Sequence, residues 1–382
     1  MAKAAKLSDT EKLARLEHLA DDAAARLDYA LMLLSTERQH EVVASALEVL
    51  AGGDDPRLRP VLLARYGQLA ESPSRLDSGA SLRAALLRAL GPLALPEDRP
   101  LMERAAMTYE SLLPITSPMR GDLAGGLRAA ALDALDRSDR EAAGYHAARL
   151  LADPRTSEMS GEPALTAARV LAGQGQMLPL YAYAAREAGM GTLPEVVGEC
   201  VRYLVELPPM LLAELVARFS DSSEEVILLG LLDLLLAHPA RAAYHGFLQE
   251  FLRETRTLNV YRYLVLAIRA GRDEPLIALL RAHQQAERDP RKVQVLKEAL
   301  ACEWHGRAQM PVGAQPGICS SPAYAPVATR KCPIRGPSPT PCLIGLAAPR
   351  NGGCAFPGGA PAARSGSTAS RSYARCHPRW GR

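Results

Sequence analysis

Aromatic residues are scarce in this chain, and their scarcity limits the folds open to it. They make up 5% of the 382 residues, although hydrophobic residues as a whole make up 48%. Alanine and leucine therefore supply most of the apolar surface. Both are strong helix formers, whereas the β-branched and aromatic residues that favour strands are comparatively few. The composition predicts an all-α protein.

Long hydrophobic runs are also missing. The longest, VILLGLLDLLLA at 226–237, contains Asp233 and is far short of the roughly 20 residues that span a bilayer, so it predicts a buried helix. The first residues, MAKAAKLSDTEKLARLEHL, have no apolar stretch behind their lysines and do not resemble a signal peptide. Up to residue 302 the only cysteines are Cys200 and Cys302, which suits a reducing compartment. We expect a cytoplasmic protein without membrane contacts.

Lysine is rare, and the charge is unevenly distributed. Arginine outnumbers lysine 39 to 6, a bias that indicates a GC-rich, bacterial genome and weakens any argument from arginine content to nucleic-acid binding. Residues 303–382 carry ten basic side chains and one acid, a net +9, while residues 1–302 carry 35 basic and 41 acidic side chains, a net −6. This mildly acidic body disfavours a non-specific grip on phosphate backbones, although a local basic stripe remains open.

Motifs that carry chemistry are absent as well. The chain contains no GxGxxG, GxxxxGK[ST], GxSxG or HExxH. Zinc sites need closely spaced ligand pairs, and no such pair occurs among the cysteines of the C-terminal segment: Cys319, Cys332, Cys342, Cys354 and Cys376. Adjacent acids such as Asp54 and Asp55 point roughly 100° apart on a helix and are typical of helix starts. We predict no catalytic residue, no metal and no cofactor, and we favour a non-enzyme.

What is present is a repeat. The stretch SLRAALLRALG at 81–91 returns as GLRAAALDALD at 126–136 and as EPALTAARVLAG at 162–173. Each copy has an anchor residue followed by small or apolar residues at +4, +5 and +8, which lie on one helix face. The anchors are 30 to 45 residues apart, and a ragged eighth copy is expected near Val293. The seven clear anchors are Val42, Leu82, Leu127, Pro163, Val196, Val226 and Val260.

The small residues at +4 would let neighbouring helices approach closely. They are Ala46, Ala131, Ala167, Cys200 and Gly230. Between successive anchors there is room for one further helix and two turns, and a single helix pair cannot bury its own apolar face. Stacked pairs would share a continuous core.

LRAALLRALG, PALTAARVLAG and the DPR turns resemble HEAT or HEAT-like (armadillo-type) helical repeats over about residues 36–300. The resemblance implies a right-handed α-solenoid of about seven or eight helix pairs. Tetratricopeptide repeats fit less well, because the spacings vary too widely and their Gly/Tyr pattern is missing. An irregular helical bundle is the remaining alternative.

The two ends differ from this array. Residues 1–35 are expected to form an N-terminal helical cap in which Ser8 and Glu11 have capping-box spacing, ahead of the repeats at 36–302. Residues 303–382 contain twelve Pro, eleven Gly and almost no acid. Such a composition buries too little apolar surface to offset ordering entropy. We expect a disordered, low-complexity tail, either genuine or the product of a frameshift, whose removal after Ala301 leaves thermal stability nearly unchanged.

An array without a catalytic constellation favours a non-catalytic protein–protein interaction scaffold or adaptor of unknown partner. Aromatic and arginine residues anchor many interfaces, so a group of arginines and a group of aromatic residues form the candidate interaction surface. The alternative for the arginines is ion pairing between repeats, with Asp133, Glu199 and Asp233 as candidate partners. The alternative for the aromatic rings is that they simply fill the core. The candidate residues are Arg83, Arg128, Arg169, Arg202, Arg262, Tyr244, Phe247, Phe251, Tyr261 and Tyr263.

Two other functions stay open because HEAT-like proteins include enzymes. The resemblance also covers alkylpurine DNA glycosylases, which hold an exposed base against aromatic and acidic residues in a basic groove. Here Trp304 and Trp380 lie outside the repeats and the body is acidic, which weighs against that nucleic-acid-binding, DNA-repair reading. HEAT-like phycobilin lyases are the other enzymatic branch, and nothing in the sequence selects them.

Overall fold

The computed structural model describes residues 7–110, 122–186 and 192–301. The chain divides into two units, residues 1–318 and 319–382, and every described residue belongs to the first. The expectations about the tail and its cysteines therefore lie outside the described residues, as does the segment 111–121. That segment falls within the longest anchor spacing, the 45 residues between Leu82 and Leu127.

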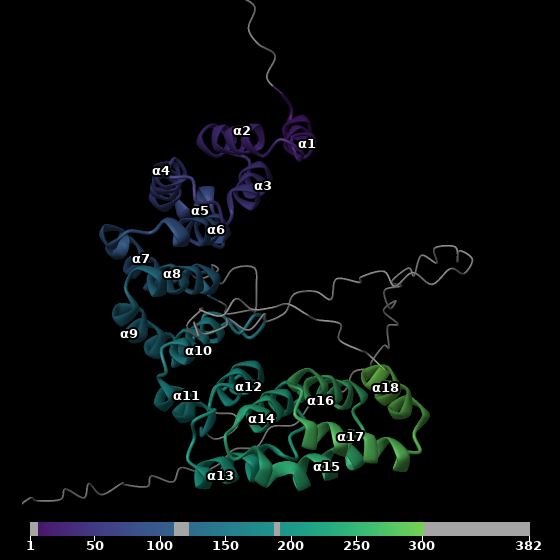
Figure 1. Cartoon of the computed structure of the whole chain (residues 1–382). Coiled ribbons are helices and arrows are strands. Elements are labelled where there is room, and N and C mark those ends of the chain that lie inside the picture. The colour runs from purple at the N-terminus through teal and green to yellow at the C-terminus, as the bar shows by residue number, and fades with distance from the viewer. Residues whose placement is uncertain (1–6, 111–121, 187–191, 302–382) are drawn as a thin grey trace, which may run out of the picture. The chain divides into compact units, whose positions relative to one another are not determined.

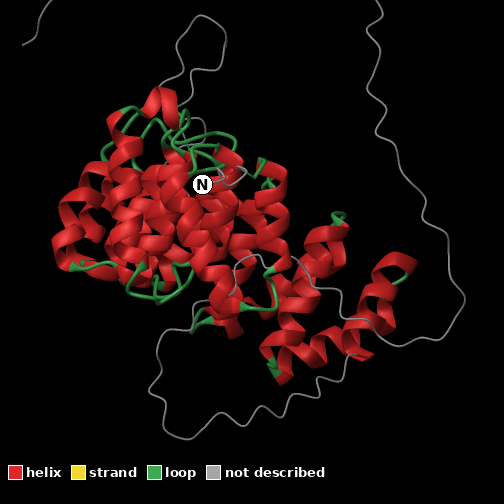
Figure 2. Ribbon diagram, turned by 90° about the horizontal axis from the view of Figure 1, so that it is seen from above, coloured by secondary structure: helices red, strands yellow, loops and turns green. Residues whose placement is uncertain are grey.

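The described residues form α-helices and three short 3-10 helices, with no strand among them (Figure 2). The all-α prediction is therefore confirmed for this part of the chain. The first nine helices are α1 (Asp9–His18), α2 (Ala23–Thr36), α3 (His40–Leu50), α4 (Leu58–Glu71), α5 (Pro73–Leu76), α6 (Ser81–Leu90), α7 (Arg99–Ala106), α8 (Gly125–Ser138) and α9 (Arg140–Leu151). The remaining helices are α10 (Ala164–Gly173), α11 (Met177–Ala184), α12 (Pro194–Arg202), α13 (Pro209–Phe219), α14 (Glu225–Ala237), α15 (His245–Glu254), α16 (Leu258–Gly271), α17 (Glu274–Ala286) and α18 (Pro290–Ala301).

Helices pack on partners that are close in the chain. One set of eight, which we call the continuous series, is formed by helices that each contact the next member (Figure 1): α3, α6, α8, α10, α12, α14, α16 and α18. The intervening helices α4, α7, α9, α11, α13 and α17 each pack on one or two members of this series. No described helix is long and apolar enough to cross a membrane.

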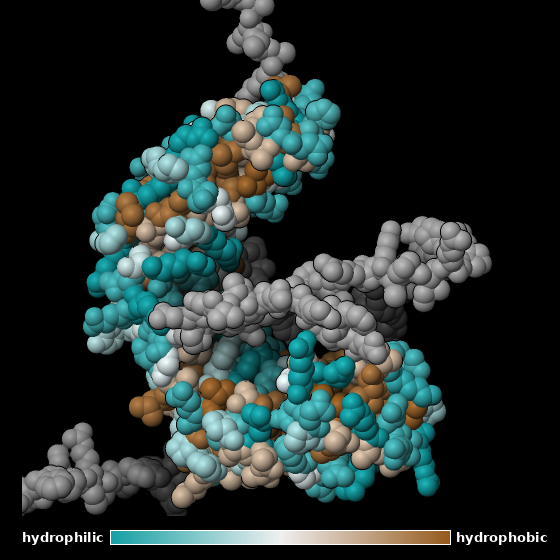
Figure 3. Space-filling view, viewed as in Figure 1, coloured by the Kyte–Doolittle hydropathy of each residue, from teal (hydrophilic) through white to brown (hydrophobic). Residues whose placement is uncertain are grey.

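The predicted register coincides with the continuous series. Every clear anchor lies in one of its helices or, for Pro163, directly before one. The residues at +4, +5 and +8 from all seven anchors are buried, and Leu90, Leu135 and Leu234 are at most 1% exposed. The repeat pattern therefore identifies a common buried face, as expected for helices that share a core. On the outside, hydrophilic side chains cover much of the described surface that Figure 3 shows.

The register of α18 needs a correction, whereas α14 fits two registers. In α18 the residues at +4 and +5 from Val293 are Lys297 and Glu298, and both are exposed. Counting from Arg291 instead gives three buried residues, namely Val295, Leu296 and Ala299. In α14 Val226 is only half-buried, and a register that begins one residue later has every position buried: Ile227, Leu231, Leu232 and Leu235.

Helices α12 and α14 approach each other closely. A methyl group on Gly230 would overlap the backbone of Gly198, and one on Gly198 would overlap the backbone at Val226. Counted from Val226, Gly230 is the small residue at +4, and the prediction that such a residue allows close packing is confirmed there. Its partner Gly198 stands at +2 of its own copy and was not anticipated.

The N-terminal capping box is also confirmed. Ser8 precedes α1; its backbone N–H donates to Glu11 Oε2 at 2.7 Å, and its Oγ accepts from the Glu11 backbone N–H at 3.3 Å. The pair satisfies two donors at the helix start that have no partner within the helix. Residues 8–35 accordingly form the helix pair α1 and α2, and both helices contact α3.

Candidate interaction surface

One repeat position faces solvent in successive helices of the continuous series. It lies six residues after the anchor, on the side of the helix away from +4, +5 and +8. With α14 counted from Ile227 and α18 from Arg291, every residue at this position is exposed or half-buried. We call them the plus-six residues: Glu48, Arg88, Asp133, Arg169, Arg202, Asp233, Leu266 and Lys297.

Ion pairs join the plus-six residues of α10, α12 and α14 through Glu199. Arg169 Nε donates to Glu199 Oε1 at 2.7 Å, and Arg202 Nη1 donates to Glu199 Oε2 at 2.9 Å. Arg202 Nε also donates to Asp233 Oδ2 at 2.6 Å. Two hydroxyls complete the network, that of Tyr203 on Glu199 and that of Tyr263 on Asp233. The inter-repeat Arg–carboxylate contacts considered from sequence are therefore present at Arg169 and Arg202.

The plus-six residues of α3, α6 and α8 are different. Glu48, Arg88 and Asp133 are exposed, and none has an ion pair within 4.0 Å among the described residues. Neighbouring protein displaces water around the Asp133 carboxyl and raises its pKa. The Glu162 carboxylate raises it further, while nearby arginines, including Arg88, oppose the shift. Arg88 and Asp133 thus present opposite charges on adjacent helices that no internal partner neutralises directly.

The plus-six position of α16 is apolar. Leu266 is 48% exposed there. Arg262, another predicted surface residue on this helix, is exposed and approaches Glu298 Oε2 of α18 at 3.9 Å. Both side chains are more than half exposed, so solvent screens the attraction and the pair contributes little to stability.

Arg83 does not lie on this surface. It is 3% exposed, and its Nε donates to Asp77 Oδ2 at 2.9 Å while its Nη2 pairs with Glu110 Oε1 at 2.6 Å. Asp77 also accepts the backbone N–H groups of Leu82 and Arg83 at the start of α6. The arginine therefore fixes the N-terminal end of its helix.

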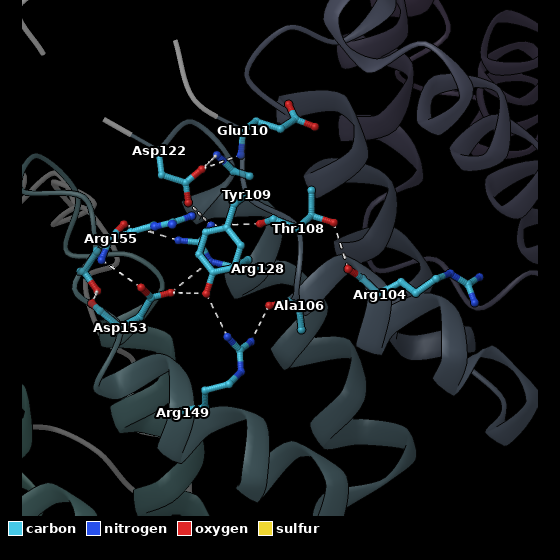
Figure 4. Close-up of polar contacts among 12 residues, drawn as sticks. Arg104, Ala106, Thr108, Tyr109, Glu110, Asp122, Arg128, Arg149, Asp153 and Arg155 are labelled. Carbon is cyan, nitrogen blue, oxygen red and sulfur yellow. Dashed lines mark hydrogen bonds and ion pairs between the residues drawn. The ribbon is translucent and has the colours of Figure 1, made fainter. Parts of the chain in front are cut away.

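Arg128 occupies the corresponding place in α8, and it is fully buried. Its guanidinium pairs with Asp122, approaches Asp153 Oδ2 at 3.8 Å and donates to the Thr108 carbonyl at 3.1 Å (Figure 4). It also stacks on the Tyr109 ring, 4.3 Å from the centroid. These contacts tie the turns after α7 and α9 to the start of α8.

The same cluster brings in further polar groups from α9 and its following turn. The Tyr109 hydroxyl donates to Asp153 Oδ2 at 2.7 Å and accepts from Arg149 Nη1 at 2.9 Å. Arg155 lies over the Tyr109 ring, 4.7 Å from its centroid. Asp122 Oδ1 accepts the backbone N–H of Glu110 at 2.8 Å, so the residues on either side of segment 111–121 are held together.

Both clusters have a signal in the sequence. Each buried arginine follows an aspartate by six residues, Asp77 before Arg83 and Asp122 before Arg128. Each also stands directly after its anchor, at +1, which lies between +4 and +5 around the helix and hence on the buried face. Their burial means that these two predicted surface residues offer no side chain to a partner.

The aromatic candidates divide in a similar way. Tyr261 is fully buried, whereas Tyr244, Phe247, Phe251 and Tyr263 are half-buried. The first three of these four pack against the core, and the Phe247 and Phe251 ring centroids are 6.1 Å apart. Core filling therefore accounts for much of this group, and an aromatic contact surface stays a prediction for the four half-buried rings.

Among the parts of the chain that the structure describes, no three His, Cys, Asp or Glu side chains come together to hold a metal ion. Cys200 is buried in the core, and desolvation raises the pKa of its thiol, which keeps it protonated and unreactive at neutral pH. Comparison of the chain with protein-family models, with curated proteins and with solved structures finds no match.

Proposed function

We propose that this protein is a non-catalytic protein–protein interaction scaffold or adaptor, built as a right-handed solenoid of HEAT-like helix pairs. The observation that carries the proposal is the set of plus-six residues. Consecutive helices of the continuous series each contribute one accessible side chain to it, from Glu48 on α3 to Lys297 on α18. A stacked array of this kind offers an extended binding surface.

The charges of this set favour a polypeptide over a polyanion. The set mixes acidic Glu48, Asp133 and Asp233 with basic Arg88, Arg169, Arg202 and Lys297. A nucleic-acid backbone on this surface would meet three carboxylates among the four cationic groups, and it binds best to a continuous positive stripe. A protein partner can present the complementary pattern of both signs.

Within the set, Arg88 and Asp133 are the proposed contact residues. The side chains of Arg169, Arg202 and Asp233 are already engaged in ion pairs. A partner that uses those would first have to break existing contacts. Arg88 and Asp133 have no such pair among the described residues, so a complementary partner gains charge-assisted contacts there at no internal cost.

Charge reversal tests this proposal. The full chain and its Arg88→Glu/Asp133→Lys variant, which conserves net charge, are used for affinity capture from the source cell with quantitative mass spectrometry. We expect at least one protein partner to be retained by the wild-type chain and depleted about tenfold or more with the variant, as for interface charges that lose their partners.

The matched control is Arg75→Glu, a reversal of an exposed arginine on α5 outside the plus-six set. It should retain the partner, and circular dichroism should show unchanged helix content in all three chains. Equal capture by the charge-reversed variant would refute the role of these residues. Enrichment of nucleic acid alone would refute the scaffold.

A further inference from the structure

A cavity of about 230 Å³, half open to solvent, lies between α2 and α4, away from the plus-six residues. Its apolar wall includes Leu34, Pro60 and Val61. Its polar wall includes Arg65, Ser35 and Gln68. The cavity thus combines an apolar lining with one cationic group, the arrangement common in small-molecule sites, where a few polar groups fix the orientation of the ligand.

Arg65 is unusual among the buried cations. It is 8% exposed, and its guanidinium is bonded only to neutral oxygens: Nη2 donates to the Glu37 carbonyl at 2.5 Å and Nη1 to Gln68 Oε1 at 3.0 Å. Its Nε is buried without a hydrogen-bond partner. The four other buried cations of the described residues each have at least one carboxylate within 4.0 Å: Lys12, Arg83, Arg128 and Lys292.

The surroundings of Arg65 disfavour its positive charge. Burial lowers its pKa, and the charge of nearby Arg38 lowers it further. Glu37 turns its carboxylate to Lys12 Nζ at 2.8 Å and contributes only its backbone carbonyl to Arg65. A buried charge without a counter-ion is costly, so an anion that entered the cavity would be stabilised by the charge already there.

We propose that this cavity is a binding site for a small aliphatic carboxylate, whose charge pairs with Arg65 and whose hydrocarbon chain lies against Leu34, Pro60 and Val61. The volume sets the size of the ligand, because 230 Å³ is below the roughly 300–1,000 Å³ of sites for drug-sized molecules. Gln68 is exposed, so its amide can move away and leave Arg65 Nη1 free to donate a hydrogen bond to the ligand. The site is independent of the interaction surface proposed above.

Calorimetric titration of the full chain with sodium hexanoate tests the site. Hexanoate should bind the wild-type chain with one-to-one stoichiometry and raise its melting temperature, whereas hexanamide, the neutral analogue, should do neither. Arg65→Met keeps the length of the side chain and removes its charge, and it should weaken hexanoate binding about tenfold or more.

A second pair of variants leaves Arg65 in place. Ala64→Leu fills the cavity that Ala64 helps to line and should abolish binding, while Ala70→Leu, at an exposed position of the same helix outside the cavity, should bind like the wild type. This pair decides the question if Arg65→Met does not fold. The proposal is overturned if hexanoate fails to bind the wild-type chain. It is also overturned if Arg65→Met and Ala64→Leu both bind hexanoate as tightly as the wild-type chain does.

Discussion

The buried cluster around Arg128 gives the sharpest stability prediction. Replacing this arginine with methionine would leave the carboxylates of Asp122 and Asp153, which are 4% and 5% exposed, without the cation that they share. Breaking a buried ion pair by removing one partner costs about 3–5 kcal/mol. The loss of the Tyr109 stacking contact adds to the cost.

Other contacts of the two acids limit this effect. Asp122 keeps the backbone N–H groups of Glu110 and Ala124, and Asp153 keeps the Tyr109 hydroxyl. We therefore expect Arg128→Met to lower the free energy of unfolding by about 3 kcal/mol, near the lower end of that range.

Urea denaturation followed by circular dichroism measures this change. The control is Arg88→Met, the same substitution at an exposed arginine of the neighbouring helix that has no ion pair among the described residues, and it should alter stability by no more than about 0.5 kcal/mol. The structural role assigned to the cluster would be refuted if Arg128→Met cost less than about 1 kcal/mol, or if the control cost as much.

Three further predictions follow from packing and titration. Replacing Leu90, Leu135 or Leu234 of the shared core with alanine should lower the free energy of unfolding by about 2–5 kcal/mol, measured by thermal or urea denaturation. A smaller loss would contradict the register at that position. Gly230→Ala, which forces a methyl group into α12, should cost about 1–3 kcal/mol, whereas Gly246→Ala, with open space around it, should not destabilise; equal melting temperatures would contradict the close approach. Burial lowers the pKa of His283 from its ordinary 6.5, so the folded state binds this proton less readily than the unfolded state and stability falls as the pH drops below about 6.5. His283→Gln should make the melting temperature decline less between pH 7 and pH 5, and an unchanged decline would contradict the assignment.

The sequence predicted the buried face of the repeats because that face depends on local periodicity. Offsets of 4, 5 and 8 describe one side of any helix, and they located buried residues from Val42 to Ile268. The two departures from the predicted register have physical causes. Helix α14 is apolar nearly all round, so two registers fit it equally, and α18 has the charged, exposed Arg291 at its anchor position, so a search for an apolar anchor stops at Val293 instead.

The functional residues were harder to predict because their surroundings depend on tertiary packing. Arg83 and Arg169 are both arginines in corresponding helices of the repeat. Arg83 stands at +1 and is buried, whereas Arg169 stands at +6 and is exposed. Helical geometry alone could have separated these two. It could not have shown that Arg65 lacks a carboxylate, because that depends on how α2 and α4 pack and on Glu37 pairing with Lys12 instead.

The most direct test of the scaffold proposal is photo-crosslinking in the source cell. A photoreactive amino acid is placed at Arg88 or Asp133 and, as a control, at Tyr145 of α9, which is 74% exposed and outside the plus-six set. The proposal predicts a discrete protein adduct from positions 88 and 133 that is absent or much weaker from position 145. Adducts from position 145 alone, or no protein adduct from either plus-six position, would contradict it.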